Sequence, residues 1–182
     1  MTISRGAGSG ETRAREPRSR GASKRRAGRE MALQMLYQRE MGNSTTPQVL
    51  HHYNPVDLLE AVRDEPQEDT LVTISGQPTQ MREALAYAHR LVEGAAGHLG
   101  ELDELIREQA EHWRLERMSV VDRNVLRLAV YELLYEPDVP KLVVLDEAIE
   151  LAKRFGSEQS GRFVNGLLDG LLRSHRFPGS MT

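Results

Sequence analysis

The 182-residue sequence contains no cysteine, few aromatic residues and no long apolar run. Without cysteine there is no disulfide, no thiol nucleophile and no thiolate metal site. No stretch of about eighteen apolar residues occurs, so we expect no membrane-spanning helix. No apolar segment follows the N-terminal arginines, so we expect no secretory signal either. These absences together predict a cytoplasmic protein.

The sequence also lacks the patterns that mark common catalytic sites. No phosphate-binding glycine loop, nucleophile elbow or redox pair occurs. The six histidines show no metal-ligand spacing. Asp146, Glu147 and Glu150 lie close together, but their spacing to Lys153 and Arg154 favours ion pairing along a helix. We therefore predict that the protein is not an enzyme and holds no metal or cofactor.

What the sequence does have is a basic N-terminus on an acidic body. Residues 1–30 hold nine Lys or Arg and three Glu, a local charge of +6, which leaves −9 for the rest of the chain. Such an asymmetry is typical of nucleic-acid contact through the basic segment. Residues 1–22 are rich in Gly, Ser and Arg, and we expect them to be a disordered arm. A solvated tail that only confers solubility is the alternative for this arm.

Helical periodicity begins at the end of the arm. Ser23 is the expected N-cap of a first helix that ends near Met41, with Gly42 as its stop. Its apolar stripe comprises Ala27, Met31, Ala32, Met35 and Leu36. We place Arg25, Arg26, Arg29 and Gln34 away from the centre of this stripe. Cations near a helix N-terminus oppose the helix dipole, and an anionic partner would offset that cost, so Lys24 to Arg29 predict phosphate binding.

Helices are also expected through most of the remaining sequence. Residues 43–79 are insertion-like and poorly patterned, with a short helix opening at Asn54-Pro55 and a brief extended segment at Leu71–Ile74. An apolar seam predicts one long helix from Met81, bent at a glycine. Ser119 caps the next helix, and two more follow over about 141–155 and 158–173. The prediction is one all-α domain of six or seven helices over residues 23–175, with 176–182 as a tail.

The most informative stretch is residues 155–169, which read FGSEQSGRFVNGLLD. Ser157 can cap the last helix and Gly156 can end the one before it. One face of this last helix is apolar and comprises Phe163, Val164, Leu167, Leu168, Leu171 and Leu172. A buried core does not account for Arg162, Asn165 and Asp169, which are left as hydrogen-bonding groups on a surface.

Three motifs in this order resemble the NusB family of bacterial transcription antitermination factors. They are residues 24–37 (KRRAGREMALQMLY), residues 121–133 (VDRNVLRLAVYEL) with the DVP and DEAIELAK segments that follow, and the stretch 155–169. The resemblance covers residues 22–42 and 80–174. Where many family members carry an acid, this chain has Gln159, and the loss of a negative charge there favours RNA binding.

The resemblance implies a NusB-like helical bundle that binds the boxA element of nascent ribosomal RNA together with the ribosomal protein NusE. The pair joins RNA polymerase and other Nus factors and suppresses premature termination, and a homodimer is also compatible with the family. The expected RNA-binding residues are Lys24, Arg25, Arg26, Arg29, Gln34, Tyr37, Phe163 and Asn165. The expected NusE-binding residues are Asp122, Arg123 and Arg127.

Structural roles compete with these assignments. Tyr37 is equally compatible with a core flank, and Arg123 and Arg127 with ion pairing on a solvated helix face. Two other functions also compete. One is an RNA-targeting module of a ribosomal RNA cytosine methyltransferase, which is disfavoured because no glycine-rich strand–turn–helix for a cofactor follows the bundle. The other is a helical adaptor that binds only proteins.

Overall fold

The computed structural model describes residues 20–55, 77–110, 114–175, 177–179 and 181. Within these ranges the chain forms α-helices and one short 3-10 helix, and no strand. The elements are α1 (Arg20–Met41), α2 (Thr46–His52), α5 (Pro78–Gly97), α6 (Leu99–Gln109), η1 (Leu115–Arg117), α7 (Val120–Tyr135), α8 (Lys141–Phe155) and α9 (Ser160–Ser174). The all-α prediction is therefore confirmed. No helix in these ranges is long and apolar enough to cross a membrane.

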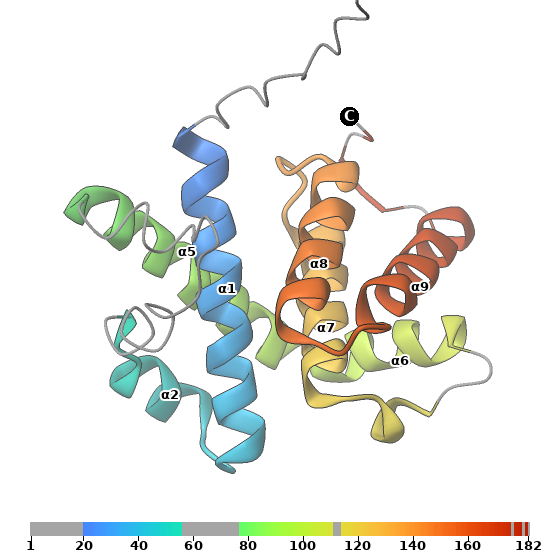
Figure 1. Cartoon of the computed structure of the whole chain (residues 1–182), viewed down its shortest axis with the longest axis horizontal. Coiled ribbons are helices and arrows are strands. Elements are labelled where there is room, and N and C mark those ends of the chain that lie inside the picture. The colour runs from blue at the N-terminus through green and yellow to red at the C-terminus, as the bar shows by residue number, and fades with distance from the viewer. Residues whose placement is uncertain (1–19, 56–76, 111–113, 176, 180, 182) are drawn as a thin grey trace, which may run out of the picture.

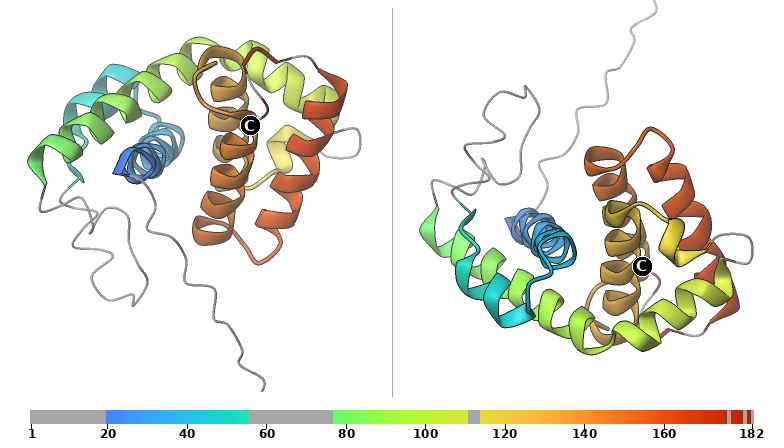
Figure 2. Two further views of the ribbon diagram at one scale, coloured as in Figure 1. Left: turned by 90° about the horizontal axis from the view of Figure 1, so that it is seen from above. Right: turned by 90° about the horizontal axis from the view of Figure 1, so that it is seen from below.

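The helices form two groups that meet along α1 and α7. Figure 1 shows α1, α2 and α5 in one group and α6 to α9 in the other. In both views of Figure 2, α5 and α6 follow one another along one side of the molecule and so connect the groups. Helix α1 packs against both α5 and α7. Its side chains can therefore reach residues of both groups.

Helix α1 buries the apolar stripe expected from the sequence. The five stripe residues are all at most 2% exposed: Ala27, Met31, Ala32, Met35 and Leu36. The helix begins at Arg20, so the prediction that Ser23 is its N-cap is wrong. It crosses α5 closely at Gly28, where a Cβ atom would lie 2.8 Å from the carbonyl oxygen of Ala84. Glycine permits this approach because it has no side chain.

Helix α2 was not predicted, and it lies inside the segment that looked like an insertion. A capping box starts it: the Gln48 amide donates to Thr45 Oγ1 over 3.4 Å, and the Thr45 amide donates to Gln48 Oε1 over 2.8 Å. Pro47 lies in its first turn. The helix expected after Pro55 and the extended segment expected at Leu71–Ile74 fall on residues outside the described ranges.

The seam expected on one long helix is divided between α5 and α6. Its central positions are buried as predicted: Ala88, Val92, Ala95, Leu102 and Ile106. The helix is interrupted at His98, next to the predicted glycine bend, where the backbone leaves helical geometry. His98 Nδ1 lies 2.8 Å from the carbonyl oxygen of Gly94. The same carbonyl accepts the backbone N–H of His98 over 3.1 Å, so His98 contacts the last turn of α5 through both its backbone and its ring.

The last three α-helices follow the prediction with one exception. Ser119 Oγ accepts the backbone N–H of Asp122 and caps α7 as expected. Helix α8 has the predicted bounds, and Gly156 is its C-cap. Ser157 does not cap α9, because the helix begins later, at Ser160, after Gln159. The backbone N–H of Ser157 instead donates to Ser160 Oγ over 2.8 Å, which closes the turn between α8 and α9.

Candidate nucleic-acid interface

Three cations of the Lys24–Arg29 segment are held by acids from three different helices. Lys24 pairs with Glu83 on α5. Arg26 donates to Glu147 on α8 through Nε over 2.8 Å and through Nη2 over 2.6 Å. This fork-shaped pair raises the pKa of Arg26, because the carboxylate accepts hydrogen bonds from the charged guanidinium. The segment is thus tied into the fold.

Arg29 is the exception to the predicted surface position. Its side chain is only 3% exposed and donates to Glu132 on α7, with Nε 2.9 Å and Nη2 2.8 Å from the carboxylate. The Tyr87 hydroxyl on α5 donates to the same carboxylate. The prediction that Arg29 lies outside the buried part of α1 is therefore wrong. The physical reason is Glu132, itself 2% exposed, which neutralises the arginine inside the fold.

Arg25 has a different environment from its neighbours. It is exposed, and it forms no ion pair with another of the residues that the structure describes. Its guanidinium is therefore available to an anion from solvent without the loss of an existing partner.

Gln34 and Tyr37 lie further along α1. Gln34 Oε1 accepts a hydrogen bond from the Tyr53 hydroxyl over 2.7 Å, so Gln34 anchors the residue that follows α2. Tyr37 is 43% exposed. Its ring is thus accessible for stacking, and a core flank would be far less exposed.

A hollow of about 600 Å³ brings Asp122 and Phe163 together. It lies between η1, the start of α7 and the α8–α9 turn, and it is lined by Arg117, Met118, Ser119, Asp122, Ser157, Gln159, Ser160, Arg162 and Phe163. Asp122 is 9% exposed, and its Oδ1 atom is buried without a hydrogen-bond partner among the residues that the structure describes. Phe163 is half-buried and packs against the core. The residue expected at the protein interface and the ring expected at the RNA interface thus share one cavity.

Two further polar residues of α9 lie on its surface. Asn165 is exposed, as is Arg162. Arg162 also lines a smaller hollow of about 270 Å³ together with Lys153, Glu158, Gln159 and Gly161. Two basic side chains therefore flank the α8–α9 turn.

Arg123 and Arg127 are partly buried, each with a side chain 12% exposed. Arg123 donates to Glu40 on α1 and to the carbonyl oxygens of Leu115 and Met118, over 2.9 and 3.1 Å. Arg127 donates to Asp103 on α6 over 2.7 Å. These contacts fix η1 and α6 against α7, so the alternative of ion pairing on a solvated face is wrong.

Glu40 is the acid that links α1 to this cluster. Besides Arg123 it accepts from Arg127 over 3.2 Å and from the Asn124 side chain over 3.1 Å. Burial by itself would raise the pKa of Glu40, but the hydrogen bond and charge of Arg123, followed by the charge of Arg127, outweigh it and lower the pKa below 4.5.

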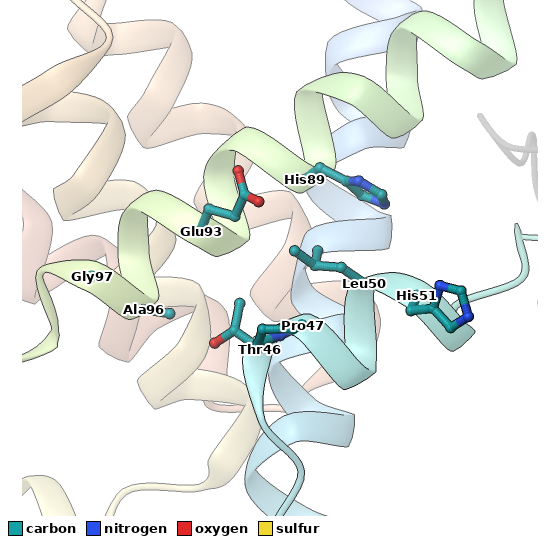
Figure 3. A pocket seen from close by; sticks show the side chains of 8 residues that line it. All are labelled: Thr46, Pro47, Leu50, His51, His89, Glu93, Ala96 and Gly97. Carbon is teal, nitrogen blue, oxygen red and sulfur yellow. The ribbon is translucent and has the colours of Figure 1, made fainter.

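Another hollow, of about 690 Å³, lies between α2 and α5 (Figure 3). Its lining comprises Thr46, Pro47, Leu50, His51, His89, Glu93, Ala96 and Gly97. It contains none of the residues predicted to bind RNA or NusE. Among the described residues no group of three or more His, Cys, Asp or Glu side chains is placed to hold a metal ion.

Comparison with known proteins identifies the family. The NusB family profile matches residues 26–173, which is most of the chain. The chain therefore belongs to the NusB family. A transcription antitermination protein NusB from Myxococcus xanthus is 45% identical over 145 residues, which cover 80% of this chain and 91% of that protein. The protein is accordingly a transcription antitermination factor and not an enzyme.

Solved NusB structures share the fold. NusB of T. maritima has a TM-score of 0.62 at 40% identity, covering 83% of this chain and 92% of that one. A structure of antitermination factors NusB and NusE in complex with dsRNA has a TM-score of 0.61 at 24% identity, covering 84% of this chain and 98% of that one. At that identity the second likeness shows the common fold alone.

The sequence missed the acids that organise this region. Glu83, Glu132 and Glu147 lie far from the basic segment in sequence, and each takes one of its cations. All three are glutamates on amphipathic helices, where glutamate is common, so the neighbouring sequence does not indicate which of them pairs with the basic segment. Arg162 was noted as a surface group but was not assigned to RNA, although it lies next to Phe163 in the cavity wall.

Proposed function

We propose that this NusB-family protein binds boxA-type single-stranded RNA together with NusE, and that the pair joins RNA polymerase and other Nus factors in the cytoplasm. The observation that carries the proposal is the hollow that Asp122 shares with Phe163. A carboxylate oxygen without a partner costs free energy in the free protein. A hydrogen-bond donor from a bound partner would recover that cost.

The proposed RNA-binding residues come from two parts of the chain, α1 and the start of α9. Arg25 supplies an accessible cation, and Tyr37 supplies an exposed ring for base stacking. Phe163 and Asn165 extend the face at the third motif, residues 155–169, where Arg162 adds a charge. Single-stranded RNA is bound largely through phosphates and stacked bases, which is the chemistry that these groups offer.

The remaining predicted residues on α1 already have partners within the protein. Lys24 and Arg26 contact RNA only by exchanging their present acids for phosphates. Arg29 and Gln34 hold α1 in place through Glu132 and Tyr53. We assign Arg29 and Gln34 to the support of the interface.

For NusE, Asp122 is the proposed contact, and Arg123 and Arg127 hold the helix that carries it. Replacement of Asp122 by Asn keeps the size of the side chain and removes its charge. We expect Asp122→Asn to weaken NusE pull-down without a lower melting temperature. Unchanged pull-down would move the NusE interface elsewhere.

The function itself is tested by co-elution with NusE, with and without a boxA oligonucleotide. We expect a NusB-family protein with few exposed rings to bind RNA modestly on its own, with steep salt dependence, and more tightly when NusE is present. An RNA gel shift at two salt concentrations separates this function from a purely protein-binding adaptor, which would give no shift at either. The mass of the free protein in solution tests whether it forms a homodimer.

A further inference from the structure

Arg26 and Glu147 form an ion pair at the edge of the proposed RNA face. Two hydrogen bonds, of 2.8 and 2.6 Å, join the guanidinium to the carboxylate. The side chains are 16% and 15% exposed, so the pair is partly buried but still open to solvent. Arg26 is therefore charged, positioned beside Arg25 and already satisfied by an acid of the same chain.

Glu147 has a second cation within reach. Its Oε2 atom lies 3.8 Å from Nη1 of Arg29, whose main partner is Glu132. If Arg26 leaves, Glu147 still faces the positive charge of Arg29. If Arg29 leaves, Glu132 stays buried with only the Tyr87 hydroxyl. Of the two arginines, Arg26 is thus the one that can exchange its partner at low cost.

An RNA phosphate offers Arg26 the same chemistry as Glu147. Both anions accept two parallel N–H hydrogen bonds from a guanidinium fork. The exchange therefore preserves the geometry of the Arg26 contact. Glu147 then keeps the contact with Arg29 at 3.8 Å, although the charge of Arg29 is shared with Glu132.

We propose that Glu147 competes with RNA phosphate for Arg26 and thereby sets the RNA affinity of this protein. This inference rests on the proposed RNA-binding function and adds a residue that controls it. Glu147 is a positioning residue, since it acts through Arg26 and does not contact RNA. In the free protein Glu147 pairs with Arg26 and holds it against α8. In the complex this ion pair is broken, and Arg26 pairs with a phosphate instead.

The test is a double-mutant cycle on the full chain, measured as affinity for a single-stranded boxA RNA oligonucleotide with NusE present. We expect Glu147→Gln to bind about tenfold more tightly, because Arg26 no longer has to leave a charged partner. In an Arg26→Ala background the same change should have no effect. Glu150→Gln is the matched control: it removes the same charge from the same helix, but Glu150 forms its ion pair with Lys153 and acts on Arg26 through its charge alone, without the two hydrogen bonds that Glu147 accepts.

A second variant separates the release of Arg26 from the change in net charge. Glu147→Asp keeps the charge but shortens the side chain, so that it cannot reach both guanidinium nitrogens, and we expect tighter RNA binding here too. This variant also replaces Glu147→Gln as the decisive one if the latter melts at a lower temperature.

Two results would overturn the inference alone. One is wild-type affinity in both Glu147 variants, while the wild type binds the oligonucleotide. The other is an equal gain with and without Arg26, which would show a general charge effect. A wild type that does not bind the oligonucleotide at all would overturn the proposed function as well.

Discussion

Replacement of Arg29 by Met tests whether the basic segment is part of the core. Methionine keeps the length and apolar stem of the side chain but removes the charge and the donors. In the variant, Glu132 would remain buried with the Tyr87 hydroxyl as its partner. The substitution therefore leaves an uncompensated carboxylate between α1, α5 and α7.

The structure sets the size of the effect. Removal of one partner from a buried ion pair costs about 3–5 kcal/mol, against a total stability of about 5–15 kcal/mol for a typical domain. With a urea m-value near 2 kcal/mol/M, the unfolding midpoint should fall by roughly 2 M. Urea unfolding followed by circular dichroism measures this directly.

Two further variants serve as controls for the stability of Arg29→Met. Arg25→Met makes the same chemical change at an exposed position without an ion pair among the described residues, and it should shift stability by less than about 0.5 kcal/mol. The triple variant Arg29→Met, Glu132→Leu and Tyr87→Phe removes both charges and the hydroxyl donor of these three residues and should recover most of the loss. Equal midpoints for Arg29→Met and Arg25→Met would refute the assignment of Arg29 to a buried pair.

Three further outcomes are expected. The pKa of Glu40 is lowered in the fold, so its contribution to stability is complete above about pH 4.5 and is lost as the pH falls through the lowered pKa. Glu40→Gln should therefore flatten the acid limb of a plot of stability against pH. An unchanged acid limb would contradict this. Arg25→Ala should reduce the slope of log RNA affinity against log salt by about 0.7, with an unchanged melting temperature; an unchanged slope would exclude a phosphate contact. Gly28→Ala should lower the free energy of unfolding by about 1–3 kcal/mol, because its Cβ would meet the carbonyl of Ala84. Gly166→Ala, where a Cβ would meet nothing within 4 Å, should raise the free energy of unfolding by up to about 1 kcal/mol. Calorimetry on both variants checks the two signs.

The elements with strong periodicity could be predicted from the sequence. The α1 stripe, the bounds of α8 and the Ser119 cap all follow from local rules, because helix formation depends on residues three or four positions apart. Helix α2 was missed although Thr45 and Gln48 have the capping-box spacing. Its short length and polar surroundings concealed the signal.

The partners of charged side chains could not be predicted in this way. The acid that binds Arg29 is 103 positions away in sequence, and the acid that binds Arg26 is 121 positions away. Both pairings depend on how α1 packs against α7, and on the position of α8, which packs on α7. A basic run followed by an amphipathic helix therefore shows that cations are present, but their availability to a ligand depends on the tertiary structure.

Arg25, Arg26 and Arg29 illustrate three outcomes of one sequence pattern. Arg25 is exposed, Arg26 is paired at the edge of the fold, and Arg29 is paired inside it. Positions 25 and 29 are about one helical turn apart on the same face of α1, and their surroundings differ because Glu132 of α7 pairs with Arg29. A motif that looks uniform in sequence thus combines a cation open to solvent, a cation paired with Glu147 at the edge of the fold and a cation buried with Glu132. The family resemblance identifies the segment, and the acids on α5, α7 and α8 decide what each of its charges does.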